Sequence, residues 1–89
     1  MVKFAKEITR LRRIEGQARG VIRMLEDERS CVDILPQISA IEAALRAART
    51  KVLAIHAQES IAAIIENGDE EAQRMKVTEL SDLFGKFNR

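Results

Sequence analysis

The sequence predicts an all-α protein in which three helices form a single domain over residues 1–89. Hydrophobic residues make up 46% of the chain, yet only three residues are aromatic, a balance that favours helices packed on helices. The apolar residues also recur at spacings of three and four, which is the period of an amphipathic helix. A chain of this length has a small core, so we expect it to complete that core by associating with further copies.

The first helix is expected from about residue 3 to residue 27. Its apolar residues follow helical spacing and are expected to form the buried face: Phe4, Ile8, Leu11, Ile14, Ala18, Ile22 and Leu25. Gly16 and Gly20 each weaken such a helix by about 1 kcal/mol relative to alanine. Because they stand four residues apart, they share one side of the helix and would let another backbone approach closely.

The second helix is expected from about residue 31 to residue 67, after a turn in which Ser30 is a suitable N-cap. Pro36 lies beyond the first turn and removes one backbone hydrogen bond, so we expect a kink or a frayed start near Cys31. Apolar residues along this helix alternate spacings of four and three, a heptad pattern that indicates a partner helix: Ile34, Ile38, Ile41, Leu45, Ala48, Val52 and Ile55.

The third helix is expected from about residue 70 to residue 87. Asn67 and Gly68 are a favourable pair for ending the second helix, and Asp69 can cap the third. The apolar residues of this helix are Met75, Leu80, Leu83, Phe84 and Phe87.

Charge is nearly balanced over the chain but unevenly distributed. Residues 1–23 hold seven Lys or Arg against two Glu, a net charge of +5, whereas residues 66–82 hold six acids against two bases, a net charge of −4. A basic segment in a neutral protein indicates an anionic partner, and no helix-turn-helix or zinc-finger motif accompanies it. For a double-stranded DNA partner, we expect recognition to rest largely on phosphates and DNA shape, with a steep dependence on salt.

The residues expected to contact DNA form the exposed side of the first helix, with two arginines added from the second. Arg12 and Arg23 are expected nearer the edge of that side. The expected contacts are Lys3, Lys6, Arg10, Arg13, Gln17, Arg19, Arg46 and Arg49.

Cys31 and His56 are the only soft or borderline metal ligands apart from the methionines. They lie 25 residues apart on the expected second helix, a separation of about 37 Å, whereas metal–ligand bonds measure about 2.0–2.3 Å. The two side chains therefore cannot meet within one chain. In an antiparallel pair of second helices that cross between Ala43 and Ala44, Cys31 of one chain faces His56 of the other. Small residues around that midpoint would permit close approach: Ala40, Ala43, Ala44, Ala47 and Ala48.

Glu59 or Ser60, about one turn from His56, could complete such a site. Each residue of the pair also has a simpler interpretation: Cys31 as a small buried hydrophobic residue and His56 as a structural residue. A thiol and an imidazole could act as a nucleophile and a base. No oxyanion-hole loop, phosphate cradle or paired carboxylates accompany them, so an enzyme is not expected.

Several stretches resemble the copper-sensitive operon repressor family, which also contains nickel/cobalt sensors and formaldehyde sensors. The likeness extends from about residue 8 to residue 65 and rests on His56 and on LRRIEGQ at 11–17, RMLE at 23–26, SCVDIL at 30–35 and QISAI at 37–41. The resemblance implies a three-helix protomer, an antiparallel dimer built on the second helices, and a dimer-of-dimers tetramer. It also implies a repressor that binds operator DNA when unliganded and leaves it when an inducer binds at the dimer interface.

Residue by residue, Cys31 matches the family's central cysteine and His56 its histidine. Ser60 takes the place of the second cysteine of copper sensors and of the second histidine of nickel sensors. The start Met1-Val2-Lys3 lacks the N-terminal proline of formaldehyde sensors and the N-terminal histidine of nickel sensors. Two identities of the inducer are therefore compatible with these residues. One is a transition-metal ion, one per subunit (copper, nickel, cobalt or zinc), and the other is an electrophile such as formaldehyde, which needs no metal.

No hydrophobic run approaches the roughly 20 residues of a membrane span, and no signal-peptide pattern opens the chain. We therefore expect a cytoplasmic protein without a membrane partner. A structural helical adaptor is the remaining alternative. It would show neither salt-dependent DNA binding nor a loss of function in Cys31→Ala.

Overall fold

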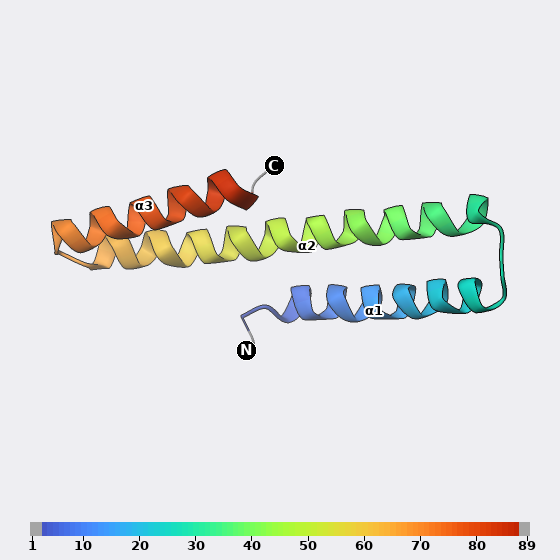
Figure 1. Ribbon diagram of the computed structural model, residues 1–89. Helices are drawn as coiled ribbons and strands as arrows, with labels where there is room; N and C mark the ends of the chain where they lie inside the picture. The colour runs from blue at the N-terminus through green and yellow to red at the C-terminus, as the bar shows by residue number, and fades with distance from the viewer. Residues whose placement is uncertain (1–2, 88–89) are drawn as a thin grey trace. The chain divides into compact units, whose positions relative to one another are not determined.

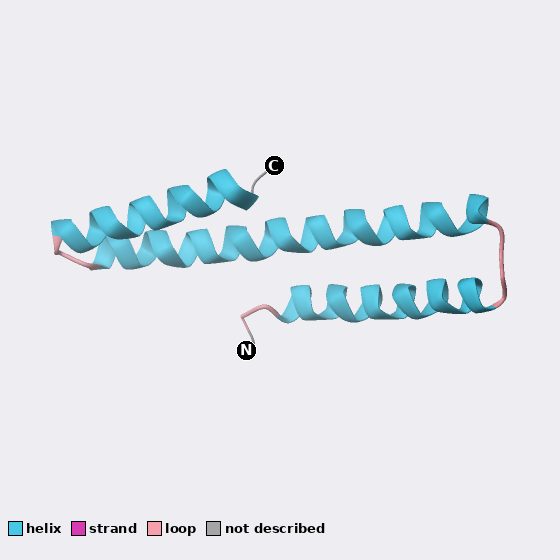
Figure 2. Ribbon diagram, in the orientation of Figure 1, coloured by secondary structure: helices cyan, strands magenta, loops and turns pink. Residues whose placement is uncertain are grey.

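The computed structural model describes residues 3–87, and in that range it contains three α-helices and no strand (Figures 1 and 2). Helix α1 spans Ala5–Glu26, α2 spans Cys31–Glu66 and α3 spans Glu70–Phe87. The expected all-α class with three helices is thereby confirmed. Met1 and Val2, which enter the comparison with formaldehyde and nickel sensors, lie outside the described residues.

The chain divides into two compact units that share α2. The first unit runs to Ala48 and holds α1 with the first half of α2, and the second starts at Arg49 and holds the rest of α2 with α3. No helix within residues 3–87 is long and apolar enough to cross a membrane.

Helix α1 ends in a Schellman motif. The backbone N–H of Glu28 donates to the carbonyl of Leu25 at 3.1 Å, and that of Arg29 donates to the carbonyl of Met24 at 2.9 Å, the pair of bonds that defines this motif. Glu28 has a φ of 54°, in the left-handed region. Glycine usually holds this position because a side chain there costs about 1–2 kcal/mol, so Glu28 marks a strained point of the turn.

Helix α2 begins directly after Ser30, which caps it as predicted. The hydroxyl of Ser30 accepts a hydrogen bond from the backbone N–H of Val32 at 3.3 Å. Its carbonyl accepts from the N–H groups of Asp33 at 2.9 Å and Ile34 at 3.1 Å. These bonds satisfy donors that the first turn would otherwise leave unpaired. The helix continues without interruption through Pro36, so the frayed start expected from that proline is not found.

In the first unit, α1 and the first half of α2 lie side by side and antiparallel (Figure 1). Helix α1 buries Glu7, Ile14 and Val21, while α2 buries Ile34 and Ala48. The three buried positions of α1 are spaced by seven residues and therefore form one row along the helix. Glu7 lies in the first turn, where a carboxylate is favoured by the helix dipole.

The predicted buried face of α1 is wrong for most of its residues. Among the large apolar residues expected there, Ile14 is buried, but four others are 39–55% exposed: Ile8, Leu11, Ile22 and Leu25. For Ile8, Leu11 and Ile22 the reason is geometric, because the apolar stripe of α1 is wider than the strip that one neighbouring helix covers, whereas Leu25 lies in the last turn of the helix. Its other edge remains uncovered in a single chain.

In the second unit, α3 packs along the second half of α2. Leu53 and Ala57 of α2 are buried, and Leu80 and Leu83 of α3 are half-buried. Met75, which was expected on the apolar face of α3, is 69% exposed. Leu80 and Leu83 therefore form the covered edge of α3, and Met75 lies away from it.

Hydrogen bonds fix the joint between α2 and α3. The side-chain amide of Gln73 donates to the carbonyl of Ile64 at 2.8 Å and also to the carbonyl of Asn67, so it satisfies acceptors at the end of α2. The carboxylate of Asp69 accepts from the backbone N–H of Glu71 at 3.2 Å. Asp69 is therefore the N-cap of α3, as predicted.

Candidate functional site

Cys31 is the first residue of α2, and its thiol is exposed. The hydrogen bonds of the Ser30 cap hold the turn on which it lies. The interpretation of Cys31 as a hydrophobic residue buried within its own chain is therefore wrong. The thiol is accessible to a ligand or to a second chain.

His56 lies in the second half of α2 and is also exposed. The hydroxyl of Ser60, one turn further on, lies 3.4 Å from Nε2 of His56, within hydrogen-bonding distance. The imidazole tautomer decides which of the two groups donates. The structure thus brings His56 and Ser60 together, and the Ser60 hydroxyl orients the ring. Glu59 is exposed on the same stretch of helix.

The described part of a single chain does not assemble a complete metal site. Within residues 3–87, no group of three or more His, Cys, Asp or Glu side chains is placed to hold a metal ion. Cys31 and His56 lie on one continuous helix, whose rise keeps them about 37 Å apart. A site that uses both residues requires two chains.

Cys31 and His56 nevertheless lie on the same side of α2. The helix turns by about 100° per residue, so the separation of 25 positions corresponds to seven turns less about 20°. Ile38, Leu45 and Val52 share this side at spacings of seven, and they are 38–45% exposed. We call these five residues the Cys–His row. It is an exposed apolar row with a thiol at one end and an imidazole at the other.

The heptad pattern of α2 is therefore divided between covered and uncovered positions. Ile34 and Ala48 are buried in the first unit, whereas the Cys–His row beside them is exposed. On α1, the exposed Leu11 and Ile22 are likewise rotated around the helix axis away from its buried row. On both helices the rotation from the buried row to the exposed row has the same sense. Because the two helices are antiparallel, both exposed rows therefore lie on one side of the helix pair. The first unit presents a single apolar surface built from both helices.

The alanines expected at the crossing point do not belong to the Cys–His row. Ala44 is half-buried and Ala48 is buried, both in the first unit. The other three are exposed, but they lie about 150–170° around α2 from the row: Ala40, Ala43 and Ala47. The expectation that small residues let two second helices approach closely stays a prediction, and these three alanines lie on a different face of α2 from the row.

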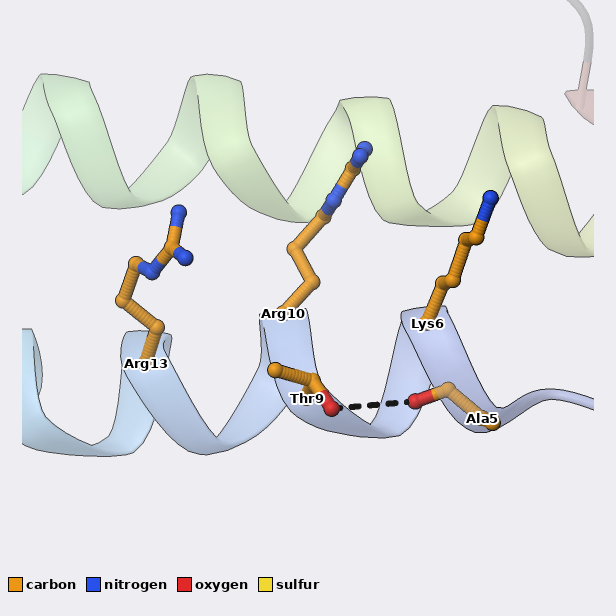
Figure 3. Close-up of a pocket in the computed structure, with 5 residues that line it drawn as sticks. All are labelled: Ala5, Lys6, Thr9, Arg10 and Arg13. Atoms are coloured by element: carbon orange, nitrogen blue, oxygen red, sulfur yellow. Dashed lines mark hydrogen bonds between the residues drawn. The ribbon is translucent and has the colours of Figure 1, made fainter.

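The basic residues of α1 form two groups. Lys6, Arg10 and Arg13, with Ala5 and Thr9, line a shallow open hollow, and the three cationic side chains extend to the same side of the helix (Figure 3). The hydroxyl of Thr9 donates to the carbonyl of Ala5 at 3.1 Å, so it is occupied within the helix. Within residues 3–87, none of the three cations has an ion-pair partner. They are available to an anionic ligand.

Gln17 continues this first group at helical spacing, but Arg19 does not. Arg19 lies about 120° around α1 from Arg13. It groups instead with Arg12 and Arg23, which were expected only at the edge. We call these two groups the basic flanks of α1. The rotation of 100° per residue, applied to the sequence, was the signal that could have separated them.

The remaining expected DNA contacts lie outside these two flanks. Lys3, at the start of the described chain, lies over the ring of Phe4, with its amine 4.8 Å from the ring centre. Arg46 is exposed in the first unit, and Arg49 is exposed at the start of the second.

Comparison with known proteins adds family and fold. Residues 4–86 match the family described as metal-sensitive transcriptional repressor. The chain is 46% identical over 80 residues to the copper-sensing transcriptional repressor CsoR of Bacillus subtilis (strain 168), covering 90% of this chain and 76% of that protein. It is 42% identical over 59 residues to the copper-sensing transcriptional repressor RicR of Mycobacterium tuberculosis (strain ATCC 25618 / H37Rv), covering 66% and 62% of the two chains.

Solved structures share the fold. The copper-sensing repressor CsoR with Cu(I) from Geobacillus thermodenitrificans NG80-2 aligns with a TM-score of 0.78 and 40% identity over 100% of this chain and 95% of that chain. The nickel-responsive transcriptional regulator InrS aligns with a TM-score of 0.74 and 34% identity over 90% of each chain. The proteins named in these comparisons are transcriptional regulators, which confirms the expectation that no enzyme activity is involved.

Proposed function

Because the chain belongs to the family of metal-sensitive transcriptional repressors, we propose that it represses by binding operator DNA and leaves the DNA when an inducer joins Cys31 of one subunit to His56 of another. The observation that carries this proposal is the Cys–His row. It places a thiol and an imidazole on one exposed apolar side of α2, where only a second copy of the helix can bring them together. The repressor acts in the cytoplasm, where its operator lies.

The dimer that this requires is antiparallel and symmetric about the midpoint between Ala43 and Ala44. In that register each residue of α2 faces the one equally far beyond the midpoint on the partner, so Cys31 faces His56 of the partner subunit. The apolar surface of the first unit, including Leu11 and Ile22 of α1, would then be covered by the partner's helices. Burying it gains about 25 cal/mol for each Å² of apolar area. Two such dimers would form the tetramer.

The donor set suits one transition-metal ion per subunit, two per dimer. A thiolate and an imidazole are ligands for copper(I), zinc, nickel and cobalt, and the soft thiolate favours copper(I). The ion would supply the link between the two side chains. Cys31 would release its proton on binding, and Ser60 would hold the His56 ring in place. The hydroxyl of Ser60 is a far weaker ligand for copper(I) than the thiolate that copper sensors have at this place.

An electrophile is the second candidate inducer, and the lone exposed thiol favours it. The sulfur of Cys31 would add to the carbonyl carbon of formaldehyde, and the imidazole nitrogen of the partner's His56 would then replace the new hydroxyl group. The product would be an S–CH₂–N bridge, with one water molecule released. This chemistry would use one thiol and one imidazole, and it would need no metal.

DNA release follows from linkage between the two ligands. The basic flanks of α1 would be repeated in every subunit of the tetramer, so many phosphates would be contacted at once. If the bridged dimer presents these flanks less favourably to the duplex, DNA and inducer weaken each other's binding by the same factor. Arg46 would extend the surface on α2.

The test is a fluorescence-anisotropy titration of labelled operator candidates with the wild-type protein, Cys31→Ala and His56→Ala. Copper(I), nickel, cobalt, zinc and formaldehyde are added separately. The wild type should release DNA with one of them, and both variants should bind DNA normally without responding. Val32→Ala and Gln58→Ala are matched controls, since both residues are exposed neighbours outside the Cys–His row.

Three outcomes contradict the proposal. An absence of DNA binding in Cys31→Ala would show that the thiol has a structural role. A normal inducer response in His56→Ala would remove the imidazole from the site. A wild-type protein without salt-dependent DNA binding would support the structural adaptor instead.

A further inference from the structure

We infer that Glu42 of one subunit pairs with Arg49 of its partner, and that the two symmetric ion pairs select the register in which Cys31 meets His56. This inference rests on the proposed antiparallel dimer. It adds a partner and a role for two charged residues that lie among the apolar residues of the interface.

Both charges lie on the side of α2 that holds the Cys–His row. Arg49 follows Cys31 by 18 residues, which is five full turns at about 100° per residue. Glu42 follows Cys31 by 11 residues, which is three turns and about 20° more. Leu45 stands between them on the same side. The centre of the exposed apolar row therefore carries one acid and one base.

Neither charge has an ion-pair partner in the described part of its own chain. Glu42 and Arg49 are exposed, and among residues 3–87 no ion pair forms at either of them. They stand seven residues apart, two turns of the helix, whereas partners within a helix are three or four residues apart. A partner helix that covers the row would take both charges out of water, which is unfavourable unless each finds an opposite charge.

The antiparallel register supplies that opposite charge. About the midpoint between Ala43 and Ala44, Glu42 faces Leu45 of the partner subunit. The partner's Arg49 lies four residues further along, about 6 Å along the axis, within reach of a long guanidinium side chain. A parallel pairing in register would instead place Glu42 against the partner's Glu42. The charge pattern favours the antiparallel arrangement and disfavours the parallel one.

This pairing assigns Arg49 to the subunit interface and removes it from the expected DNA contacts. Arg49→Ala should therefore leave the salt dependence of DNA binding unchanged for the intact oligomer. Lys51 is exposed on the same helix but lies about 100–160° around it from the members of the Cys–His row. It provides a matched position outside the interface.

The test is a charge-swap cycle read by sedimentation equilibrium, with neither inducer nor DNA present. Glu42→Arg and Arg49→Glu should each raise the dissociation constant of the oligomer about tenfold, since each creates two like-charged pairs. The double swap Glu42→Arg with Arg49→Glu should restore most of the affinity. Lys51→Glu, which makes the same charge change outside the row, should leave the constant within about twofold of the wild type.

The ion pair would be overturned if the double swap raised the dissociation constant as much as the two single variants combined. It would also be overturned if Lys51→Glu raised the constant as much as Arg49→Glu does. Helical content measured by circular dichroism checks that each variant folds. The sensing proposal is judged separately. A rescued double swap in a protein that ignores every inducer would support the ion pair and reject sensing. If an inducer releases the protein from DNA but the double swap does not restore the affinity, the sensing proposal is supported and the ion pair is rejected.

Discussion

Replacing His56 by cysteine converts the proposed register into a covalent test. In an antiparallel dimer centred between Ala43 and Ala44, the new thiol lies opposite Cys31 of the partner subunit. Mild oxidation should then join two subunits by two symmetric disulfides. Gln58→Cys is the matched control, because Gln58 is exposed on the same stretch of α2 but lies about 160° around the helix from His56.

The geometry makes this test demanding. A disulfide requires its two Cα atoms to be about 4.4–6.8 Å apart. Within one chain the two positions are 25 residues apart, or about 37 Å, so any disulfide between them must join different subunits. A slip of one helical turn would shift the partner by about 5.4 Å, enough to prevent the bond in most cases. Efficient cross-linking therefore reports both the direction of the partner helix and its register.

The assay is non-reducing electrophoresis combined with a count of free thiols before and after oxidation. His56→Cys should run as a covalent dimer with almost no free thiol, and its thermal midpoint should no longer depend on protein concentration. Gln58→Cys should remain mainly monomeric under the same denaturing conditions. Free thiols that persist in His56→Cys, or equally efficient cross-linking of Gln58→Cys, would refute the antiparallel Cys–His row.

Three further changes test the turn, the ligand set and the basic surface. Glu28→Gly should raise the free energy of unfolding by about 1 kcal/mol in urea titrations, because glycine relieves the left-handed backbone at φ 54°; a decrease in stability would contradict the strain. Ser60→Cys should strengthen copper(I) binding at least about tenfold in a chelator competition, because it adds a second thiolate, and a result equal to that of Ser60→Ala would count against Ser60 lying beside the metal. Arg10→Ala with Arg13→Ala should make the slope of log K against log salt shallower by about 0.9 for each DNA phosphate that the variant no longer neutralises, and an unchanged slope would place the DNA on another surface.

The ends of the helices could be predicted from the sequence because the interactions that set them are local. Ser30 and Asp69 each bond to backbone groups a few residues away, and a cap of that kind is visible in the order of residues alone. The contact between His56 and Ser60 follows from the same logic, since residues four apart lie together on a helix. The frayed start expected from Pro36 is absent because the Ser30 cap bonds the first turn of α2, while the kink that was the other expectation stays a prediction.

The choice of buried edge on α1 could not be predicted in the same way. The sequence shows a wide apolar stripe but not which part of it α2 covers. That choice depends on a long-range contact, which places Val21 inside and leaves Ile22 53% exposed. The alanines of α2 are a weak guide for a related reason. Small size permits close approach, but it does not say on which side of the helix the neighbour lies.

The uncovered residues are nevertheless the informative part of the pattern. A heptad repeat with one internal partner would bury both of its rows, yet only the row of Ile34 and Ala48 is buried in the first unit, while Ile38 and Leu45 are 38% and 45% exposed. An exposed row of large apolar residues at a spacing of seven is typical of a helix that a second partner covers. Because Cys31 and His56 occupy the two ends of that row, a partner that covers it in the proposed antiparallel register would also bring the thiol to the imidazole. In the proposed dimer, the surface that assembles the oligomer and the site that binds the inducer would be one structure, so the inducer would act on the arrangement of the subunits directly.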